Sequence, residues 1–518
     1  MATNPLRQIE LLLRQNKVRE AASLCQRLTR SHGHVPDVWK VMGRIAQVKA
    51  DTAAMVKSAE RLEALAPNDV AGPLLRSQAH VQEGRIRKAV ACLEEIENRW
   101  SDDVDVLQQI AEFYTHAGRF DLAKRCHLSA AKLQPDNPAV LYNLATSHIA
   151  TGGLDKAEDL LDRVIELKPD DFEAWQNRST LRKQTPERNH VRELEGLVAR
   201  RDLEAARKVP LHYALAKEYE DLGRYDEAFV QFSRGASARR SQMAYRVEAD
   251  LETMNRIMRV FDNRFSDSAL QGFEEVSPIF VLGLPRSGTT LVDRILSSHT
   301  EVESLGEIND FAICLTRAVG PVKSKEELVE RSAKIDFEAL GRTYVANCVE
   351  RSHGGRVLLD KTPSNFLYIG IILKALPNAR VVHLRRHPLD SCFAMYKTLF
   401  RMGYPFSYDL DDLARYYLVY DALMKHWDNL FGERVLTVHY EDLVGGLEPV
   451  AREMVAYCGL EWQDACLEFH KNESPSATAS AAQVRQPLYS SAVARWKRYE
   501  KGLSGLKQAL SADGIELD

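Results

Sequence analysis

The sequence predicts a chain of two parts, an α-helical repeat array followed by an α/β domain built on a parallel sheet. Three observations support this fold class. Motifs recur every 34 residues in the front half, a glycine-containing strand-to-helix turn lies at 279–296, and apolar runs alternate with helical stretches behind it. With 518 residues, the chain is also too long for one ordinary domain. We place the helical array at 1–270 and the α/β domain at 271–518.

The composition excludes several classes of protein. Hydrophobic residues make up 45% of the chain and charged residues 27%, which is typical of globular proteins and not of disordered ones. A net charge of −4 argues against a general nucleic-acid or anionic-membrane binder, so any anion site must be local. The eight cysteines form no CxxC pair, which predicts reduced thiols and no zinc ribbon. Without a secretory signal or an apolar stretch long enough to span a membrane, we expect a cytoplasmic protein.

The front half is organised as a 34-residue repeat. Each unit is predicted to be a helical hairpin, in which glycine ends the first helix in a left-handed turn and alanine lets the two helices approach closely. A generic helical bundle is the alternative, but it does not explain a period shared by several columns. The recurring positions are 67, 101, 135 and 169 for a proline/aspartate motif, Gly84, Gly118 and Gly152 for the turn, and Ala21, Ala89, Ala123 and Ala157 for the close contact, with Met55 in the unit between Ala21 and Ala89.

The same glycine-to-alanine spacing returns at Gly223 and Ala228, three residues out of phase. The array is therefore predicted to resume after an irregular unit at 185–196. Over about residues 1–240 the pattern resembles the tetratricopeptide-repeat family. This resemblance implies an α-solenoid whose concave surface binds a partner or presents a substrate.

The turn at 283–290, GLPRSGTT, has the glycine spacing of a phosphate-binding loop. In such a loop, backbone N–H groups and the start of a helix surround an oxyanion. The P-loop-like turn differs from that of nucleotide hydrolases, because Thr289 stands where they have lysine, and the cation is Arg286 instead. A glycine-rich turn without a ligand is the alternative. The predicted anion-binding residues are Pro285, Arg286, Ser287, Gly288, Thr289 and Thr290.

Further strands are predicted at 356–361, 379–386 and 434–443, each an apolar run that ends in charged residues. Because strands alternate with helices, the sheet should be parallel, and ligands should collect at the carboxyl ends of its strands. The Arg286 loop, Lys361 and the pair Arg385/Arg386 all fall at that edge. Together they suit a ligand with two separated anionic groups, although each charge alone could be a solvated strand end.

These motifs resemble the sulfotransferases, especially the Sulfotransfer_3-type branch that includes the tyrosylprotein sulfotransferases, over about residues 275–500. The resemblance implies that 3′-phosphoadenosine 5′-phosphosulfate (PAPS) is the donor and that the GLPRSGTTL loop holds its 5′-phosphosulfate. It also implies that Lys361, in LLDKTP, contacts the transferred sulfuryl group. The matching nucleotide-contacting positions are Arg386, in the 3′-phosphate segment VVHLRRHPLDSCFA, and Ser480 and Arg495 near the C-terminus.

Two positions depart from the family pattern. Ala394 stands where the family usually has a serine that contacts the 3′-phosphate, and Ser391 is a candidate replacement one helical turn earlier. Pro363 stands where the small-molecule branch has its histidine base, which excludes a histidine base at that position.

Glu307, in SLGEIND, is the predicted base. It lies 21 residues after Arg286, the interval of the catalytic glutamate in the tyrosylprotein enzymes, which it resembles. The helix after the loop carries the chain about 15 Å from the binding edge, and residues 300–307, if extended, span about 26 Å and bring it back. The alternative is an exposed carboxylate that caps the next helix.

The sequence therefore predicts a PAPS-dependent sulfotransferase that acts on an acceptor hydroxyl of a protein or peptide tyrosine or of a glycan, with the acceptor presented by the repeats. In this reading Glu307, Arg286 and Lys361 are catalytic, and no metal is required. A repeat-based scaffold with a non-catalytic nucleotide domain and a P-loop phosphotransferase are the alternatives. The sequence leaves open the acceptor, the oligomeric state and the face of the repeats that binds a partner.

Overall fold

The computed structural model describes residues 5–268, 271–401, 403–475, 483–486, 488 and 492–517. The chain divides into two compact units. One comprises residues 1–147 with 349–351, and the other comprises residues 148–348 with 352–518. The predicted boundary after residue 270 is a division by sequence pattern, and it stays a prediction.

The first unit consists of paired helices, as the 34-residue period predicts. The turn glycines adopt the expected left-handed conformation, with φ of 77° at Gly84 and 76° at Gly118. The alanine column is buried, since Ala89 and Ala123 are at most 1% exposed. The helices are α1 Pro5–Arg14, α2 Val18–His32, α3 Pro36–Val48, α4 Thr52–Leu65, α5 Ala71–Gln82, α6 Ile86–Arg99, α7 Val104–His116, α8 Phe120–Leu133 and α9 Pro138–Thr151, the last of which continues into the second unit.

The second unit begins with more helices of the same kind. The expected irregular unit, residues 185–196, covers part of the loop after α11 and the first part of the short helix α12, and the regular pattern returns in the hairpin α13–α14 around Gly223, whose φ is 78°. The helices are α10 Leu154–Leu167, α11 Phe172–Thr180, α12 Val191–Ala199, α13 Ala205–Asp221, α14 Tyr225–Arg240, α15 Val247–Val260 and α16 Asn263–Ser266.

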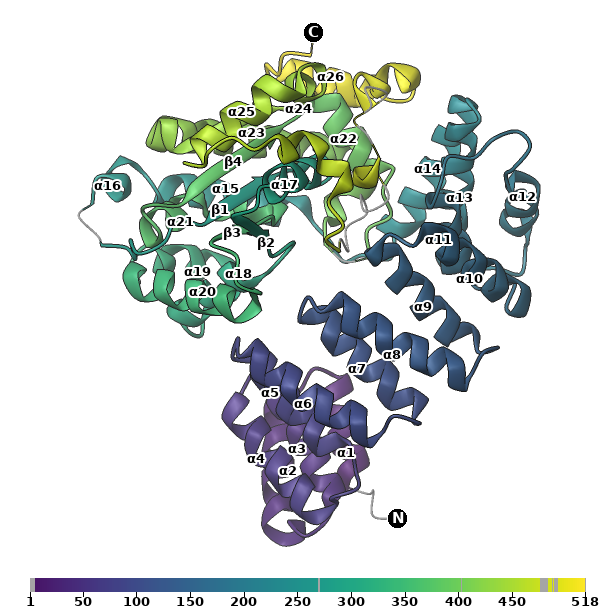
Figure 1. The fold of residues 1–518 in the computed structure, drawn as a ribbon, viewed down its shortest axis with the longest axis vertical. Helices are drawn as coiled ribbons and strands as arrows, with labels where there is room; N and C mark the ends of the chain where they lie inside the picture. The colour runs from purple at the N-terminus through teal and green to yellow at the C-terminus, as the bar shows by residue number, and fades with distance from the viewer. Residues whose placement is uncertain are drawn as a thin grey trace. The chain divides into compact units, whose positions relative to one another are not determined.

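A parallel sheet forms the centre of the second unit, where Figure 1 labels β1 to β4. It has five strands in the order β2-β3-β1-β4-β5. The strands are β1 Ile279–Gly283, β2 Val302–Ser304, β3 Val357–Asp360, β4 Arg380–Arg385 and β5 Val435–His439. The parallel α/β fold is therefore confirmed. Two details differ from the sequence prediction. β2 lies in a segment that was expected only to be extended, and the last strand ends at His439, four residues early.

The early end of β5 has a physical reason. Tyr440 begins helix α24 (Tyr440–Gly445), and Glu441 and Asp442 lie in its first turn. Acidic side chains are stabilised there by the partial positive charge of the helix N-terminus. The charged residues that were expected to close the strand therefore start a helix.

Helices cover both faces of the sheet. Along β1, Ile279 and Val281 pack into the apolar core shared with α17 and α25, whereas Phe280 and Leu282 pack into the larger core on the other face. No helix among the described residues is long and apolar enough to cross a membrane. The remaining elements are α17 Thr289–Ser297, α18 Asp310–Val319, α19 Lys325–Ser332, α20 Phe337–Arg351, η1 Pro363–Tyr368, α21 Ile369–Ala375, α22 Pro388–Tyr396, η2 Pro405–Tyr408, α23 Leu410–Phe431, η3 Gly432–Arg434, α25 Leu447–Tyr457, η4 Asp464–Lys471, η5 Gln483–Arg485, η7 Arg495–Tyr499 and α26 Ser504–Ala512.

Candidate active site

The loop between β1 and α17 requires glycine at both ends. Gly283 has a φ of 146°, and a Cβ there would lie 2.5 Å from the carbonyl oxygen of Leu384. Gly288 has a φ of 111°, and a Cβ there would lie 2.7 Å from the ring of Tyr440. Glycine alone tolerates these dihedral angles and this closeness. The two glycines therefore let the loop pass tightly over β4 and deliver the N-terminus of α17 to the sheet edge.

The residues inside the loop are arranged as an anion site needs. Arg286 is held at a φ of 65°, which is uncommon for a residue with a side chain and is found more often at functional sites. Pro285, Thr289 and Thr290 are buried. Ser287 is 1% exposed, and its hydroxyl has no hydrogen-bond partner among the described residues. A buried hydroxyl without a partner is costly, so this one fits a polar ligand in the loop.

Arg386 follows β4 and turns toward the loop. Its guanidinium donates hydrogen bonds to the carbonyls of Arg286 at 3.3 Å and Ala492 at 2.5 Å, and it lies 4.8 Å from the ring centre of Tyr440. Nε of this buried side chain has no partner among the described residues. The adjacent Arg385 instead pairs with Asp421 on α23 at 2.8 Å, because successive side chains at the strand end point to opposite faces.

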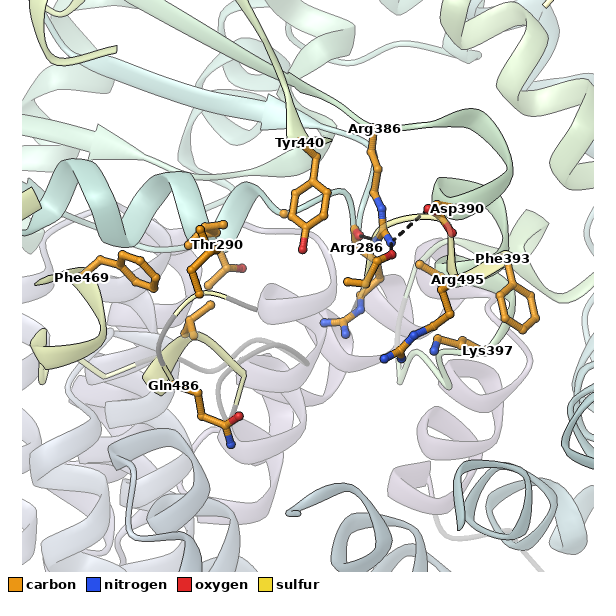
Figure 2. Close-up of a pocket in the computed structure, with 16 residues that line it drawn as sticks. Arg286, Thr290, Arg386, Asp390, Phe393, Lys397, Tyr440, Phe469, Gln486 and Arg495 are labelled. Carbon is orange, nitrogen blue, oxygen red and sulfur yellow. Dashed lines mark hydrogen bonds and ion pairs between the residues drawn. The ribbon is translucent and has the colours of Figure 1, made fainter. Parts of the chain in front are cut away.

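A cavity brings several predicted residues together (Figure 2). Figure 2 shows Arg386, Lys397 and Arg495 gathered at one side, Thr290 and Phe469 at the other, and Arg286 between them. Lys397 and Tyr440 line the same cavity and were not predicted. The predicted residues in its wall are Arg286, Gly288, Thr290, Arg386 and Arg495.

Ser480 lies outside the described residues. At the position of the missing family serine, Ala394 lines the cavity. Ser391, the candidate replacement, does not: it is 1% exposed and donates its hydroxyl to the carbonyl of Arg386 at 3.4 Å. The lost serine contact is therefore not restored by Ser391 in this structure.

Lys361 and Glu307 form an ion pair, with 2.5 Å between Nζ and Oε1. They lie at the carboxyl end of β3, next to β1, and neither lines the cavity around Arg386. The segment after β2 runs beside β3, where Leu305 N–H donates to Leu359 and Lys361 N–H donates to Gly306. This pairing returns Glu307 to the binding edge, as the expected extended segment requires. The Lys361 side chain is 1% exposed and that of Glu307 is 45% exposed.

The nearby acids have other partners. Glu303 accepts hydrogen bonds from the Ser352 hydroxyl at 2.5 Å and from the backbone N–H groups of His353 and Gly355 at 2.8 and 2.7 Å. Burial opposes ionisation, but these donors hold the pKa of Glu303 below its ordinary value. Glu301 pairs with the exposed Arg356 at 3.0 Å. Of these three carboxylates, Glu307 is the one that contacts Lys361.

Comparisons with known proteins identify relatives of both the repeats and the α/β domain. Residues 278–464 match the family model described as the sulfotransferase family, and residues 127–179 and 209–241 match tetratricopeptide-repeat models. The chain therefore combines tetratricopeptide repeats with a sulfotransferase-family domain, and it is homologous to the protein-tyrosine sulfotransferases.

Individual relatives show the extent of the likeness. An uncharacterised protein of Aquifex aeolicus is 28% identical over 84% of this chain and 58% of its own length. The protein-tyrosine sulfotransferase of Drosophila melanogaster is 24% identical over 49% of this chain and 54% of its own length. This chain thus spans less than two thirds of both relatives. Among solved structures, the sulfotransferase domain from the curacin biosynthetic pathway is 17% identical, covers 47% of this chain and all of that domain, and has a TM-score of 0.34.

Proposed function

We propose that this protein is a sulfotransferase that moves a sulfuryl group from PAPS to an acceptor hydroxyl on a protein or peptide tyrosine or on a glycan. The observation that carries the proposal is the cavity in the sulfotransferase-family domain. It joins the Arg286 loop to a second basic group that contains Arg386 and Arg495. Such a cavity suits a donor with charge at both its 5′ and 3′ positions.

The residues fit this donor. The unpartnered hydroxyl of Ser287 and the N-terminus of α17 suit a 5′-phosphosulfate, which would be held by Pro285 through Thr290. The unpartnered Nε of Arg386 suits a 3′-phosphate, which Arg495 and Ser480 would also contact. When bound, the donor supplies a sulfuryl group joined to its 5′-phosphate through oxygen.

The catalytic residues would act at the edge formed by β1 and β3. Glu307 accepts the proton of the acceptor hydroxyl while the new oxygen–sulfur bond forms and the bond from sulfur to the phosphate oxygen breaks. The electron pair of the broken bond stays on that phosphate oxygen. Arg286 and Lys361 offset the negative charge that develops there. Lys361 also orients Glu307 through their 2.5 Å contact.

The repeats indicate which class of acceptor the protein would bind. Helical repeats of this kind present extended surfaces, so we expect a protein, peptide or glycan acceptor rather than a small metabolite. A screen of labelled sulfate transfer from PAPS to tyrosine peptides and to glycans identifies the acceptor class. If the protein transfers sulfate to neither class of acceptor and does not bind PAPS, the scaffold alternative is favoured.

Nucleotide preference tests the donor. By calorimetry without magnesium, 3′-phosphoadenosine 5′-phosphate should bind more than tenfold more tightly than ADP or ATP, since each charge-assisted contact to the 3′-phosphate contributes roughly 1.5–3 kcal/mol. Arg386→Met should abolish most of this preference. Arg385→Met is the matched control, because Arg385 pairs with Asp421 outside the cavity.

Two outcomes would contradict the assignment. Equal affinity for ADP and the 3′-phosphorylated nucleotide removes the role given to Arg386 and Ser480. Tight ATP binding that depends on magnesium, with phosphate transfer, would establish the phosphotransferase alternative instead.

A further inference from the structure

The wall of the cavity contains a cation that none of the sequence motifs identifies. Lys397 directly follows α22 and comes three residues after Ala394, the position where the family serine is missing. Both residues line the cavity. The Lys397 side chain is only 16% exposed, so its ammonium is largely removed from bulk water.

A carboxylate from the helical repeats holds this lysine. Glu220 lies near the end of α13, and both of its oxygens are 2.9 Å from Nζ of Lys397. The same carboxylate lies 3.5 Å from the guanidinium of Arg495 and accepts a hydrogen bond from the hydroxyl of Tyr499 at 2.9 Å. The Glu220 side chain is 11% exposed. One acid from the repeat hairpin therefore contacts two basic residues of the cavity wall.

Further contacts between the hairpin α13–α14 and helix α22 surround this ion pair. Tyr213 on α13 donates its hydroxyl to the carbonyl of Tyr396 at 3.2 Å, and Phe232 on α14 contacts the ring of Phe393 edge-on at 6.2 Å between centres. Phe393 also lines the cavity. The hairpin α13–α14 is thus fixed against α22, the helix that leads from Arg386 to Lys397.

The charges around the lysine are unbalanced. Among the described residues that line the cavity, four are basic, Arg286, Arg386, Lys397 and Arg495, and one is acidic, Asp390. Burial, helped by Arg495 and Arg286 and opposed by Glu220, lowers the pKa of Lys397 to about 8. Although burial disfavours its ionised form, Lys397 and Arg495 hold the pKa of Glu220 below its ordinary value. An anionic group in the cavity would relieve the excess of positive charge.

We infer that Lys397 binds the 3′-phosphate of the donor in place of the missing serine, and that Glu220 is a positioning residue that aims Lys397 and Arg495 at it. The inference rests on the proposed function, because it assumes that the donor carries a 3′-phosphate. It makes the hairpin α13–α14 part of the donor site, so the repeats and the sulfotransferase-family domain share one binding surface.

The full-length protein is tested with two probes, 3′-phosphoadenosine 5′-phosphate and adenosine 5′-monophosphate, which differ only in the 3′-phosphate. Lys397→Met should weaken binding of the first nucleotide roughly tenfold to a hundredfold and leave binding of the second within about twofold. Retained binding of the monophosphate shows that the variant is folded at the 5′ site. Lys397→Arg should recover part of the loss, because it keeps the charge.

Glu220→Gln should weaken binding of the 3′-phosphorylated nucleotide at least fivefold, by the same comparison. Asp221→Asn is the matched control on the same helix, since Asp221 pairs with Lys217 and not with the cavity residues. In the Lys397→Met background, Glu220→Gln should add less than its effect alone, because the two residues act as a unit.

A pH profile separates positioning from a general structural role. Beside Lys397, the pKa of Glu220 lies below its ordinary value, whereas burial raises the pKa of Tyr499 and lowers that of Lys397 to about 8, so Lys397 is the group expected to lose its charge near pH 8. Affinity for the 3′-phosphorylated nucleotide should therefore fall as the pH rises through about 8. In Glu220→Gln the fall should begin at lower pH, because the lysine loses its counter-ion.

The outcomes are distinguishable. If the wild type prefers the 3′-phosphorylated nucleotide and Lys397→Met keeps that preference, the inference is wrong and the proposed donor stands. If the wild type shows no preference for the 3′-phosphate, the proposed donor fails and the inference fails with it. If Glu220→Gln leaves both the preference and the pH profile unchanged, the repeat hairpin does not position the site.

Discussion

The carboxylate of Glu307 can meet an acceptor because nearly half of its side chain is exposed, although its partner Lys361 is buried. The two residues are 54 positions apart and meet because the segment after β2 runs beside β3. This arrangement leaves the proposed proton acceptor open to solvent on one side and held by Lys361 on the other. A base needs both, since it must reach the hydroxyl in one defined geometry.

Glu307→Gln keeps the size of the side chain but removes the negative charge that is proposed to take the proton. We expect turnover of a verified acceptor to fall at least a hundredfold, because a positioned base contributes roughly 10²–10⁴ in rate. Affinity for 3′-phosphoadenosine 5′-phosphate should change less than threefold. Steady-state sulfate transfer and calorimetry on the same preparation measure the two effects.

The control for this variant is Glu301→Gln, whose exposed ion pair with Arg356 contributes little to stability. Glu303 would be a poor control, because its carboxylate accepts three hydrogen bonds from the 352–355 loop. Activity of Glu307→Gln near the wild-type value would mean that another group removes the proton. Loss of nucleotide affinity as well would mean that Glu307 maintains the shape of the loop.

Residues within a local motif could be predicted from the sequence, and residues that meet across the fold could not. Arg286 and Arg386 each follow a strand, and the structure places both in the cavity wall. Lys397 has no motif around it, and its partner Glu220 is 177 residues earlier in the chain. Trp496 likewise meets its partner across the fold, since it is 5% exposed and stacks on His387.

Strands and helices were predictable where a pattern is long enough to read. β1, β3, β4 and β5 are apolar runs next to turn residues, and all four were predicted. β2 has three residues and no alternation, so only its pairing with β3 defines it as a strand. The helix α24 was missed because an apolar run followed by acids has the same appearance whether the strand continues or a helix begins.

The loop between β1 and α17 provides a prediction about backbone geometry. Gly288→Ala places a Cβ 2.7 Å from Tyr440 at a φ of 111°, so the loop must shift away from the site. We expect affinity for 3′-phosphoadenosine 5′-phosphate to fall at least tenfold, because the backbone N–H groups no longer converge. The melting temperature should also fall, since strain of this kind costs on the order of 1–3 kcal/mol.

Gly354→Ala is the matched control for the loop. Its φ of 116° imposes similar strain, but nothing lies within 4 Å of the added Cβ. This variant should lose stability and keep its nucleotide affinity. Equal nucleotide affinity in Gly288→Ala and Gly354→Ala would show that the β1–α17 loop does not hold the nucleotide.

The division of the chain by contacts differs from its division by motif. By motif, the repeats run to about residue 240 and the sulfotransferase-like segment starts near 275. By contacts, residues 148–348 and 352–518 form one compact unit that contains α10–α14 together with the sheet. The apolar core of that unit includes Tyr213 and Phe232 from the repeat hairpin and Phe393 and Tyr499 from the sheet side. A repeat pattern identifies a helix hairpin but cannot tell which neighbour buries its outer face.

This core predicts which truncations keep the donor site. A chain of residues 135–518 retains α9 to α14 and Glu220, so it should bind 3′-phosphoadenosine 5′-phosphate within about threefold of the full-length protein. A chain of residues 241–518 lacks the hairpin, which exposes Phe393, Tyr396 and Tyr499 and leaves Lys397 without its carboxylate. It should be poorly soluble or melt at lower temperature, and any folded fraction should bind the nucleotide at least tenfold more weakly. Calorimetry and thermal melting of both fragments decide the matter. If the folded 241–518 fragment binds the nucleotide as tightly as the 135–518 fragment, the repeats contribute nothing to nucleotide binding. Their contribution would then be limited to binding the acceptor.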